Sequence, residues 1–139
     1  LPLASVITPN LPEAADLLGQ AEANTFEEMT SQGEALLKTT GADWVLMKGG
    51  HLKGQESDDC LMSVTERHWF SAPRISTKNT HGTGCTLSSA IAAELARLND
   101  VPKAAAAAKA YVAGAIAHAD ELEVGAGHGP THHFWQLWR

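Results

Sequence analysis

The fold is decided by the stretch VITPNLPE at residues 6–13. Residues 4–8 are rich in β-branched side chains and are followed by a Pro-Asn pair, which predicts a short buried strand that runs into a loop. The first turn of a helix tolerates proline, so Pro12 and the apolar residues around it predict a short helix that ends at Gly19. A strand, a loop and a helix are therefore expected in close succession.

A second helix and a second strand follow. Thr25 and Glu28 match a capping box, and apolar residues at three- and four-residue spacing continue from there to Gly41. Residues 43–48 have the pattern of a strand that is ended by two glycines. A strand, helices and a strand make a βαβ unit, so the two strands are expected to be parallel.

The remaining segments predict a hairpin and two more helices. Residues 60–64 and 67–72 flank a short turn and predict a hairpin, although this turn lacks Gly or Asn. Apolar residues from Leu87 to Leu98 trace one face of a helix, and an alanine-rich helix is expected from Asp100 to about Leu122. The tail after these helices has no clear period, and no stretch has the composition of an interdomain linker.

Length, composition and charge argue against several classes of protein. With 139 residues, of which 44% are hydrophobic, the chain is expected to form one domain or part of one. The net charge of -6 comes from acids spread along the chain, so no basic stripe is available for nucleic acid. Residues 104–119 include Lys109 and His118, so no membrane span is expected there. Cys60 and Cys85 form no disulfide framework, which favours reduced thiols and the cytoplasm.

A glycine-bearing loop, NTHGTGC at residues 79–85, directly precedes the first of the two later helices. Its glycines allow a tight turn with exposed amide donors, and the start of the helix adds a partial positive charge. The amides from about Gly82 through Thr83 and Gly84 to Cys85 would stabilise the charge that spreads over a transferring phosphoryl group. The alternative is an ordinary glycine-rich loop that caps a helix.

Cysteine and histidine side chains offer further hypotheses. Cys85 would lie in the first turn of that helix, where the local field favours a thiolate able to accept a proton from a substrate hydroxyl. The alternative for a lone cysteine is a small buried hydrophobe. His81 suggests a Cys-His nucleophile, but no orienting acid is evident, and the intervening Gly-Thr-Gly suits a phosphate better. His128, His132 and His133 suggest a metal cluster, but their segment lacks a firm scaffold.

Two more loops follow the expected parallel strands at their carboxyl ends. Open parallel α/β sheets bind ligands at this edge, so Glu13 is placed to hold Mg²⁺ directly or through water. Lys48 would balance nucleotide phosphates as a point charge. The alternatives are a first-turn acid that complements the helix dipole and a solubilising lysine at the end of a strand. We expect all three loops to meet along one side of the sheet and to form one site.

Three stretches resemble the hydroxymethylpyrimidine/phosphomethylpyrimidine kinases of thiamin biosynthesis, which belong to the ribokinase-like superfamily. They are residues 6–13, residues 45–51 (VLMKGGH) and residues 77–88 (TKNTHGTGCTLS), and a Gly-Pro-x-His-His-Phe tail at residues 129–134 extends the likeness over essentially the whole chain. The resemblance implies a three-layer α/β fold with a mostly parallel central sheet. Residues 1–139 would form the C-terminal part of a single kinase domain.

What the resemblance leaves unmatched also matters. Members of this family open with a Gly-rich segment and several strands that build most of the pyrimidine pocket, and these have no counterpart in this sequence. Two parallel strands and a hairpin would leave a sheet edge unpaired where those strands belong. We therefore expect the chain to be a fragment that turns over poorly or not at all by itself.

The resemblance also implies an activity and a set of site residues. The activity is the ATP-dependent phosphorylation of 4-amino-5-hydroxymethyl-2-methylpyrimidine, and then of its monophosphate, with Mg²⁺. Cys85 stands where many superfamily members have a catalytic Asp, which leaves the identity of the proton acceptor open. The residues that match family positions are Gly82, Thr83, Gly84 and Cys85 for the anion hole and catalysis, Asn10, Lys48, Gly49 and Thr80 near the nucleotide, and Glu13 for Mg²⁺.

Other functions stay open on the sequence alone. Pyridoxal also carries a hydroxymethyl group on an aromatic nitrogen ring, so pyridoxal kinase is the second enzyme hypothesis. A nucleotide-binding or regulatory module without catalysis and a structural half-domain that assembles with a separate partner are the non-enzymatic hypotheses. We expect a small-molecule pyrimidine as the binding partner and, for the full-length protein, a homodimer.

Overall fold

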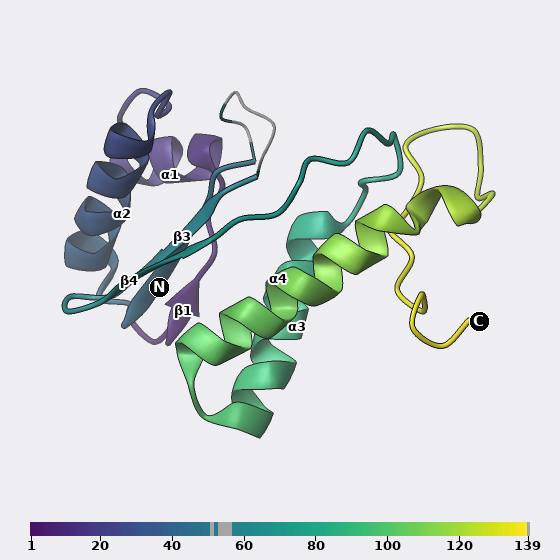
Figure 1. Ribbon diagram of the computed structural model, residues 1–139. Coiled ribbons are helices and arrows are strands. Elements are labelled where there is room, and N and C mark those ends of the chain that lie inside the picture. Colours follow the sequence, from purple (N-terminus) through teal and green to yellow (C-terminus); the bar gives the residue numbers. More distant parts are fainter. Residues whose placement is uncertain (51, 53–56, 139) are drawn as a thin grey trace. The chain divides into compact units, whose positions relative to one another are not determined.

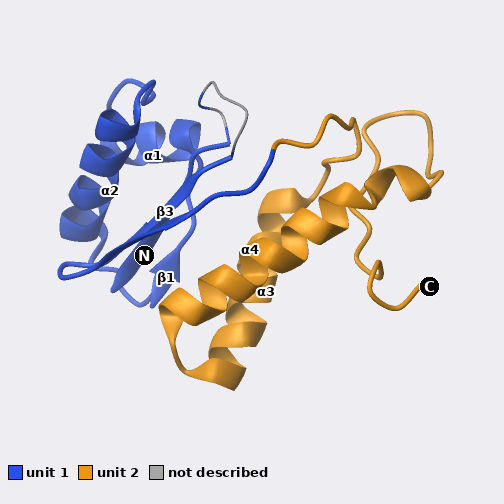
Figure 2. Cartoon of the chain, viewed as in Figure 1, with its two compact units in different colours: residues 1–73 blue, residues 74–139 orange. Residues whose placement is uncertain are grey.

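The computed structural model describes residues 1–50, 52 and 57–138, and these residues form two compact units (Figure 1; Figure 2). Unit 1 is Leu1–Pro73 and contains a sheet with two helices. Unit 2 is Arg74–Arg139 and contains two long helices and the C-terminal tail. Sequence composition did not predict this division, because no linker-like stretch marks the boundary.

The sheet of unit 1 has four strands in the order β1-β2-β3-β4. Strands β1 and β2 are parallel, which confirms the predicted βαβ unit, and β3 and β4 form the predicted hairpin. The hairpin adds two antiparallel pairings, β2 with β3 and β3 with β4, so the sheet is mixed rather than mostly parallel in the described residues. The strands are β1 Val6–Ile7, β2 Trp44–Lys48, β3 Asp59–Met62 and β4 Arg67–Phe70.

Both helices of unit 1 begin and end at the residues that the sequence predicts. Helix α1 (Leu11–Leu18) ends at Gly19, whose φ of 63° lies in the left-handed region that glycine adopts without strain. Helix α2 (Phe26–Thr40) begins at Thr25, whose side chain accepts from the Glu28 amide. The capping box predicted there is only half formed, because the Glu28 carboxylate accepts from the amide of Asn24 at 2.7 Å.

The core of unit 1 lies between the two helices and the sheet (Figure 1). Gly33 brings α2 close to this sheet, since a Cβ at that position would lie 2.5 Å from the sulfur of Met62. Close packing of buried apolar side chains thus fixes β2, and the residues at its carboxyl end, relative to α1. The largest buried contributors are Leu11, Met29, Leu36, Val45, Met47, Cys60 and Met62.

Unit 2 is built on two packed helices, α3 (Thr83–Leu98) and α4 (Val101–Ala117). Asp100 caps α4 by accepting from the Lys103 amide at 3.0 Å. Helix α4 ends at Ala117, five residues before the predicted end near Leu122, because the chain tightens into the short 3-10 helix η1 (Ala119–Glu121). The tail is irregular, as predicted, yet it is packed: the amide of His132 donates to the Ala115 carbonyl at 2.9 Å.

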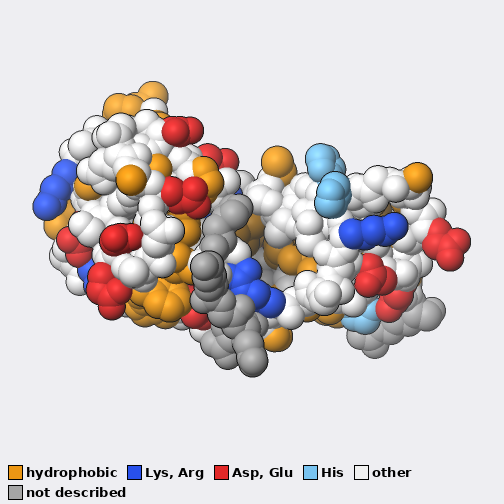
Figure 3. Space-filling view, turned by 90° about the horizontal axis from the view of Figure 1, so that it is seen from above, with side chains coloured by type: hydrophobic (Ala, Val, Ile, Leu, Met, Phe, Trp, Pro, Cys, Tyr) orange, Lys and Arg blue, Asp and Glu red, His pale blue; other side chains and the backbone are white. Residues whose placement is uncertain are grey.

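The surface carries both signs of charge, and acidic side chains are interspersed with Lys and Arg on the face shown in Figure 3. Among the described helices, none combines the length and apolarity needed to cross a bilayer. The described residues also contain no group of three or more metal-ligating side chains, so the tail histidines do not form a metal cluster. His132 is buried against Trp138, and its Nδ1 accepts from the Phe134 amide at 3.2 Å.

Candidate functional site

The predicted anion loop forms the start of α3 in unit 2. Gly82 is the N-cap and has a φ of 81°, a left-handed backbone conformation that L side chains rarely adopt. No side chain caps this helix, and a Cβ at Gly82 would meet no atom within 4 Å among the described residues. The loop therefore turns sharply at the positive end of a 16-residue helix.

The backbone amides of this loop are not all available as donors. Thr83 donates its amide to the Thr80 carbonyl at 3.3 Å, so one of the predicted anion donors is engaged inside the loop. In the part of the chain that the structure describes, no acceptor is found for the amides of Gly82, Gly84 and Cys85. Three donors, rather than the four predicted, are thus presented by the first turn.

Two hydroxyl groups that the sequence analysis did not single out hold this turn in shape. Thr86 donates both its amide and its Oγ1 hydroxyl to the Gly82 carbonyl, each at 2.8 Å. Ser88 donates its hydroxyl to the Gly84 carbonyl at 2.8 Å. The Ser88 bond fixes the peptide unit whose amide is that of Cys85, one of the three outward donors. The Thr86 bonds fix the neighbouring unit, which carries the engaged Thr83 amide, so the turn that presents the donors is preorganised.

The two cysteines have opposite environments. Cys85 is exposed at the first turn of α3, so its alternative role as a buried hydrophobe is wrong. Cys60 is fully buried in β3, and its burial raises the pKa of this thiol from 9.0 to about 11. Only Cys85 is therefore placed to exchange a proton with a ligand. The exposed His81 donates its amide to the Gly129 carbonyl at 3.1 Å, and the structure describes no acid beside its ring.

A second cluster of predicted residues lies in unit 1, at the carboxyl ends of β1 and β2. Asn10 caps α1, and it exchanges two hydrogen bonds of 2.8 Å with Glu13 in a complete capping box. Lys48 forms a parallel bridge with Asn10, and its Nζ lies 3.9 Å from Oε2 of Glu13. Two of the three predicted loops therefore meet. The alternative role of Glu13 as a first-turn acid is confirmed, and its role toward Mg²⁺ stays a prediction.

Gly49 and Thr80 have structural roles that the sequence did not reveal. The amide of Gly49 donates to Oδ1 of Asp59 at 3.1 Å, and a Cβ on Gly49 would lie 2.1 Å from the Asp58 carbonyl. Backbone packing therefore explains this glycine without a nucleotide. Thr80 is exposed and accepts from the Thr83 amide through its carbonyl, so it shapes the anion loop. Their contacts with a nucleotide stay predictions.

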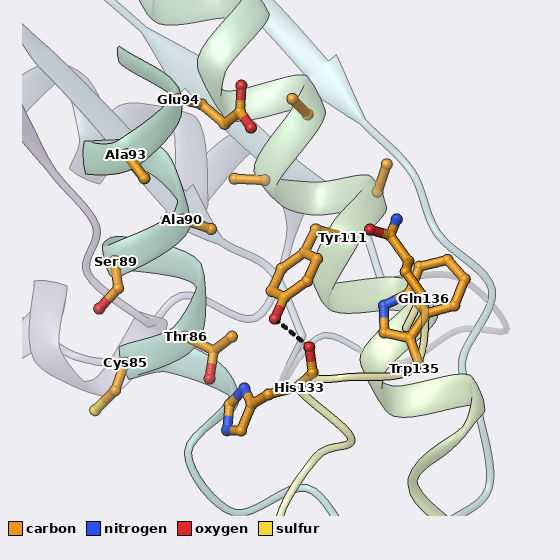
Figure 4. Close-up of a pocket in the computed structure, with 13 residues that line it drawn as sticks. Cys85, Thr86, Ser89, Ala90, Ala93, Glu94, Tyr111, His133, Trp135 and Gln136 are labelled. Atoms are coloured by element: carbon orange, nitrogen blue, oxygen red, sulfur yellow. Dashed lines mark hydrogen bonds between the residues drawn. The ribbon is translucent and has the colours of Figure 1, made fainter. Parts of the chain in front are cut away.

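A groove in unit 2 starts beside the anion loop and runs between α3, α4 and the tail (Figure 4). Cys85 and Thr86 line it from α3, Tyr111 from α4, and His133 and Trp135 from the tail. The Tyr111 hydroxyl donates to the His133 carbonyl at 2.7 Å, which fastens the tail to α4. Sequence analysis missed these tail contacts because they follow no helical or strand period.

Comparison with known proteins connects this geometry to a family. The chain matches the family model for phosphomethylpyrimidine kinase over residues 1–132. It is 54% identical over 138 residues to the hydroxymethylpyrimidine/phosphomethylpyrimidine kinase of Salmonella typhimurium. The matching segment is 99% of this chain and 52% of that protein. The protein of the same name from Escherichia coli is 52% identical, with the same coverage of both chains.

Solved structures place the fold in the same group. The ADP complex of Bacillus subtilis pyridoxal kinase has a TM-score of 0.89 at 36% identity and covers 99% of this chain and 51% of that one. Staphylococcus aureus pyridoxal kinase, in complex with AMP-PCP and pyridoxal, has a TM-score of 0.91 at 31% identity, with 99% and 50% covered. These likenesses confirm the predicted ribokinase-like α/β class. This chain spans about half the length of the relatives it matches, and it belongs to the phosphomethylpyrimidine kinase family.

Proposed function

We propose that the protein containing this chain transfers the γ-phosphoryl group of ATP to the hydroxymethyl group of 4-amino-5-hydroxymethyl-2-methylpyrimidine, and then to the resulting monophosphate. The observation that carries the proposal is the turn at Gly82, which presents three amides without acceptors among the described residues. Preorganised donors of this kind stabilise charge on a transferring phosphoryl group. The names of the Salmonella typhimurium and Escherichia coli relatives support the same substrate.

The chemistry balances as a simple displacement. The hydroxyl oxygen of the pyrimidine attacks the γ-phosphorus, the bond from that phosphorus to the β,γ-bridging oxygen breaks, and ADP leaves with the electron pair. The hydroxyl proton passes to a base, for which we propose the exposed sulfur of Cys85. In the second reaction a phosphate oxygen of the monophosphate attacks a second ATP, and the product is the diphosphate.

The cluster at the carboxyl ends of β1 and β2 would serve the nucleotide. Lys48 would contact its phosphates as a point charge, and Asn10 and Gly49 would lie near them. Glu13 fits an Mg²⁺ site held through water, because its side chain is 56% exposed and, among the described residues, only its Oε2 is engaged, by the capping box and by Lys48. Bound Mg²⁺ would neutralise phosphate charge. This arrangement requires both units to contribute to one kinase domain, in the reducing cytoplasm that suits a free thiol.

Pyridoxal is the second candidate substrate. The likeness to the Bacillus subtilis and Staphylococcus aureus pyridoxal kinases favours it, since both cover nearly all of this chain. Pyridoxal and the thiamin-precursor pyrimidine each present a hydroxymethyl group on an aromatic nitrogen ring, so the same displacement applies to both. The ratio of the two kcat/KM values decides between them.

A chimeric enzyme provides the test. In the chimera, this chain replaces the 138 matching residues of the Salmonella typhimurium relative, so that the other half of that protein completes the fold. We expect ATP-dependent formation of the pyrimidine monophosphate and diphosphate, with a kcat/KM for the pyrimidine above that for pyridoxal. The isolated chain, assayed in parallel, is expected to show no turnover.

Two results would count against the proposal. A folded chimera that binds ATP and phosphorylates neither alcohol would contradict a kinase function for this chain. A preference for pyridoxal would replace the pyrimidine with the second candidate. Turnover by the isolated chain would show that our expectation of an inactive fragment is wrong.

A further inference from the structure

The side chain of Asn79 joins the anion loop to two segments much further along the chain. Its Nδ2 donates to Oδ1 of Asp120 at 2.9 Å and to the carbonyl of Ala119 at 3.3 Å. Its Oδ1 accepts from the amide of Gly129 at 3.1 Å. Asn79 is only 8% exposed, so both ends of its amide are used in a nearly dry environment, where hydrogen bonds define geometry most strongly.

The same two segments hold the residues on either side of Asn79. The Thr77 hydroxyl donates to Oδ1 of Asp120, the same oxygen that the Asn79 side chain contacts. This hydroxyl also accepts from the backbone amide of Asn79 at 3.1 Å. On the other side, the His81 amide donates to the Gly129 carbonyl at 3.1 Å. Residues 77–81 are therefore clamped between η1 and Gly129 immediately before the turn at Gly82.

The fit leaves no spare room. A Cβ on Gly129 would lie 2.3 Å from Oδ1 of Asn79, so the backbone at Gly129 approaches the amide as closely as glycine permits. None of these contacts involves the amides of Gly82, Gly84 or Cys85 directly. They fix the point from which the chain enters the turn, and hence the direction in which those donors point.

We propose that Asn79 is a positioning residue for phosphoryl transfer, which orients the Gly82–Cys85 amides by tying the loop to Asp120 and Gly129. The inference rests on the proposed function, because it assigns the clamp to the same loop. Donors must be aimed at the place where charge develops, and a displacement of about 1 Å in such a group costs up to about 100-fold in rate. Asn79 would therefore affect kcat without contacting the substrate.

A polarity swap in the chimera tests this role. Asn79→Asp keeps the acceptor for Gly129 but sets a carboxylate against Asp120, so we expect kcat to fall by about 10- to 100-fold with KM values within about threefold. Asp120→Asn keeps an acceptor for Asn79 and should stay within about threefold of the unmodified kcat. The double variant again pairs an amide with a carboxylate, and it should recover at least about a third of the unmodified kcat.

Val112→Ala is the control for a purely structural effect. Val112 is 4% exposed in α4, so its truncation opens a cavity and lowers Tm without touching the clamp. We expect unchanged kcat in this variant at a Tm loss similar to that of Asn79→Asp. Asn79→Ser replaces the amide by a shorter hydroxyl group. This variant takes the place of Asn79→Asp if the latter does not fold, and the same loss of kcat is expected.

Three outcomes would overturn the inference. They are full kcat in the single variant Asn79→Asp or Asn79→Ser, an equal kcat loss in Val112→Ala, and a double variant no faster than Asn79→Asp. An inactive unmodified chimera would instead contradict the proposed function, so the two failures are distinguishable.

Discussion

The ammonium nitrogen of Lys48 lies 3.9 Å from Oε2 of Glu13, which joins the end of β2 to the first turn of α1. The same oxygen accepts from the Asn10 amide at 2.8 Å. Lys48 is 19% exposed at its side chain, so its charge is held near the surface and is not buried in the core. A nucleotide phosphate that arrived at this edge would compete with Glu13 for a cation that is already oriented.

Replacing Lys48 separates a nucleotide role from a structural one. In the chimera, Lys48→Gln should raise the KM for ATP by about 10-fold, because a charged hydrogen bond contributes about 1.5–3 kcal/mol. The loss of the partly exposed ion pair with Glu13 should cost no more than about 1 kcal/mol in stability. Steady-state kinetics and thermal melting measure both effects. Lys38→Gln, on the exposed side of α2, is the control, and an equal KM in the two variants would contradict the assignment.

Replacing Cys85 tests the proton acceptor. Cys85→Ser should lower kcat by about 100-fold or more, as is typical when a general base is lost. The thiol is exposed, so Tm should change little. Cys60→Ala, which removes the buried thiol, should leave kcat unchanged, and a wild-type kcat in Cys85→Ser would assign the proton to another group.

The buried thiol of Cys60 predicts a pH effect on stability. Its pKa is about 11 in the folded chain against an ordinary value of 9.0, because burial disfavours the thiolate. Above pH 9 the unfolded chain loses this proton while the folded chain keeps it, so the free energy of unfolding falls as the pH rises from 9 to 11, by about 2–3 kcal/mol in full. Denaturant unfolding of the chimera at pH 8 and pH 10 measures this change. In Cys60→Ala the decrease in unfolding free energy from pH 8 to pH 10 should be smaller by about 1 kcal/mol. An identical decrease in both proteins would show that Cys60 is not its cause.

Two neighbouring glycines should respond differently to the same substitution. A Cβ on Gly49 would lie 2.1 Å from the Asp58 carbonyl, so Gly49→Ala should cost about 1–3 kcal/mol of stability through overpacking. At Gly50 the nearest atom of a described residue would be Oγ of Ser57 at 3.6 Å, an ordinary contact, and Gly50→Ala should change stability by less than about 0.5 kcal/mol. Both predictions are checked by measuring the unfolding free energies of the two variants without nucleotide. Equal unfolding free energies would mean that the backbone at Asp58 shifts to accept the added methyl group, which would contradict the prediction.

The parts of the fold that the sequence predicts are those that local chemistry determines. The first helical turn at Pro12 and the helix ends at Gly19 and Gly41 follow from residues within a few positions of each other. The parallel pairing of β1 with β2 follows from the strand, helix and strand order alone. The meeting of Asn10, Glu13 and Lys48 is a direct consequence of that pairing.

The parts that could not be predicted depend on contacts between distant residues. Asn79 and Gly129 are 50 positions apart, and nothing in either segment indicates that one amide will donate to the other. The hydrogen bond from the Thr83 amide to the Thr80 carbonyl depends on how the turn closes, which the Gly-Thr-Gly sequence does not determine. The division after Pro73 likewise follows from tertiary packing and not from the composition of the segment.

The central claim is that the left-handed turn at Gly82 orients amides for phosphoryl transfer, and one pair of alanine variants in the chimera tests it most directly. Gly82 and Gly125 lie in the same unit with φ values of 81° and 67°, and a Cβ on either would meet no described atom within 4 Å. Alanine should therefore impose a similar backbone strain of about 1–2 kcal/mol at both positions. We predict that Gly82→Ala lowers kcat by at least about 10-fold while Gly125→Ala keeps it unchanged. Equal kcat values in the two variants would contradict the account.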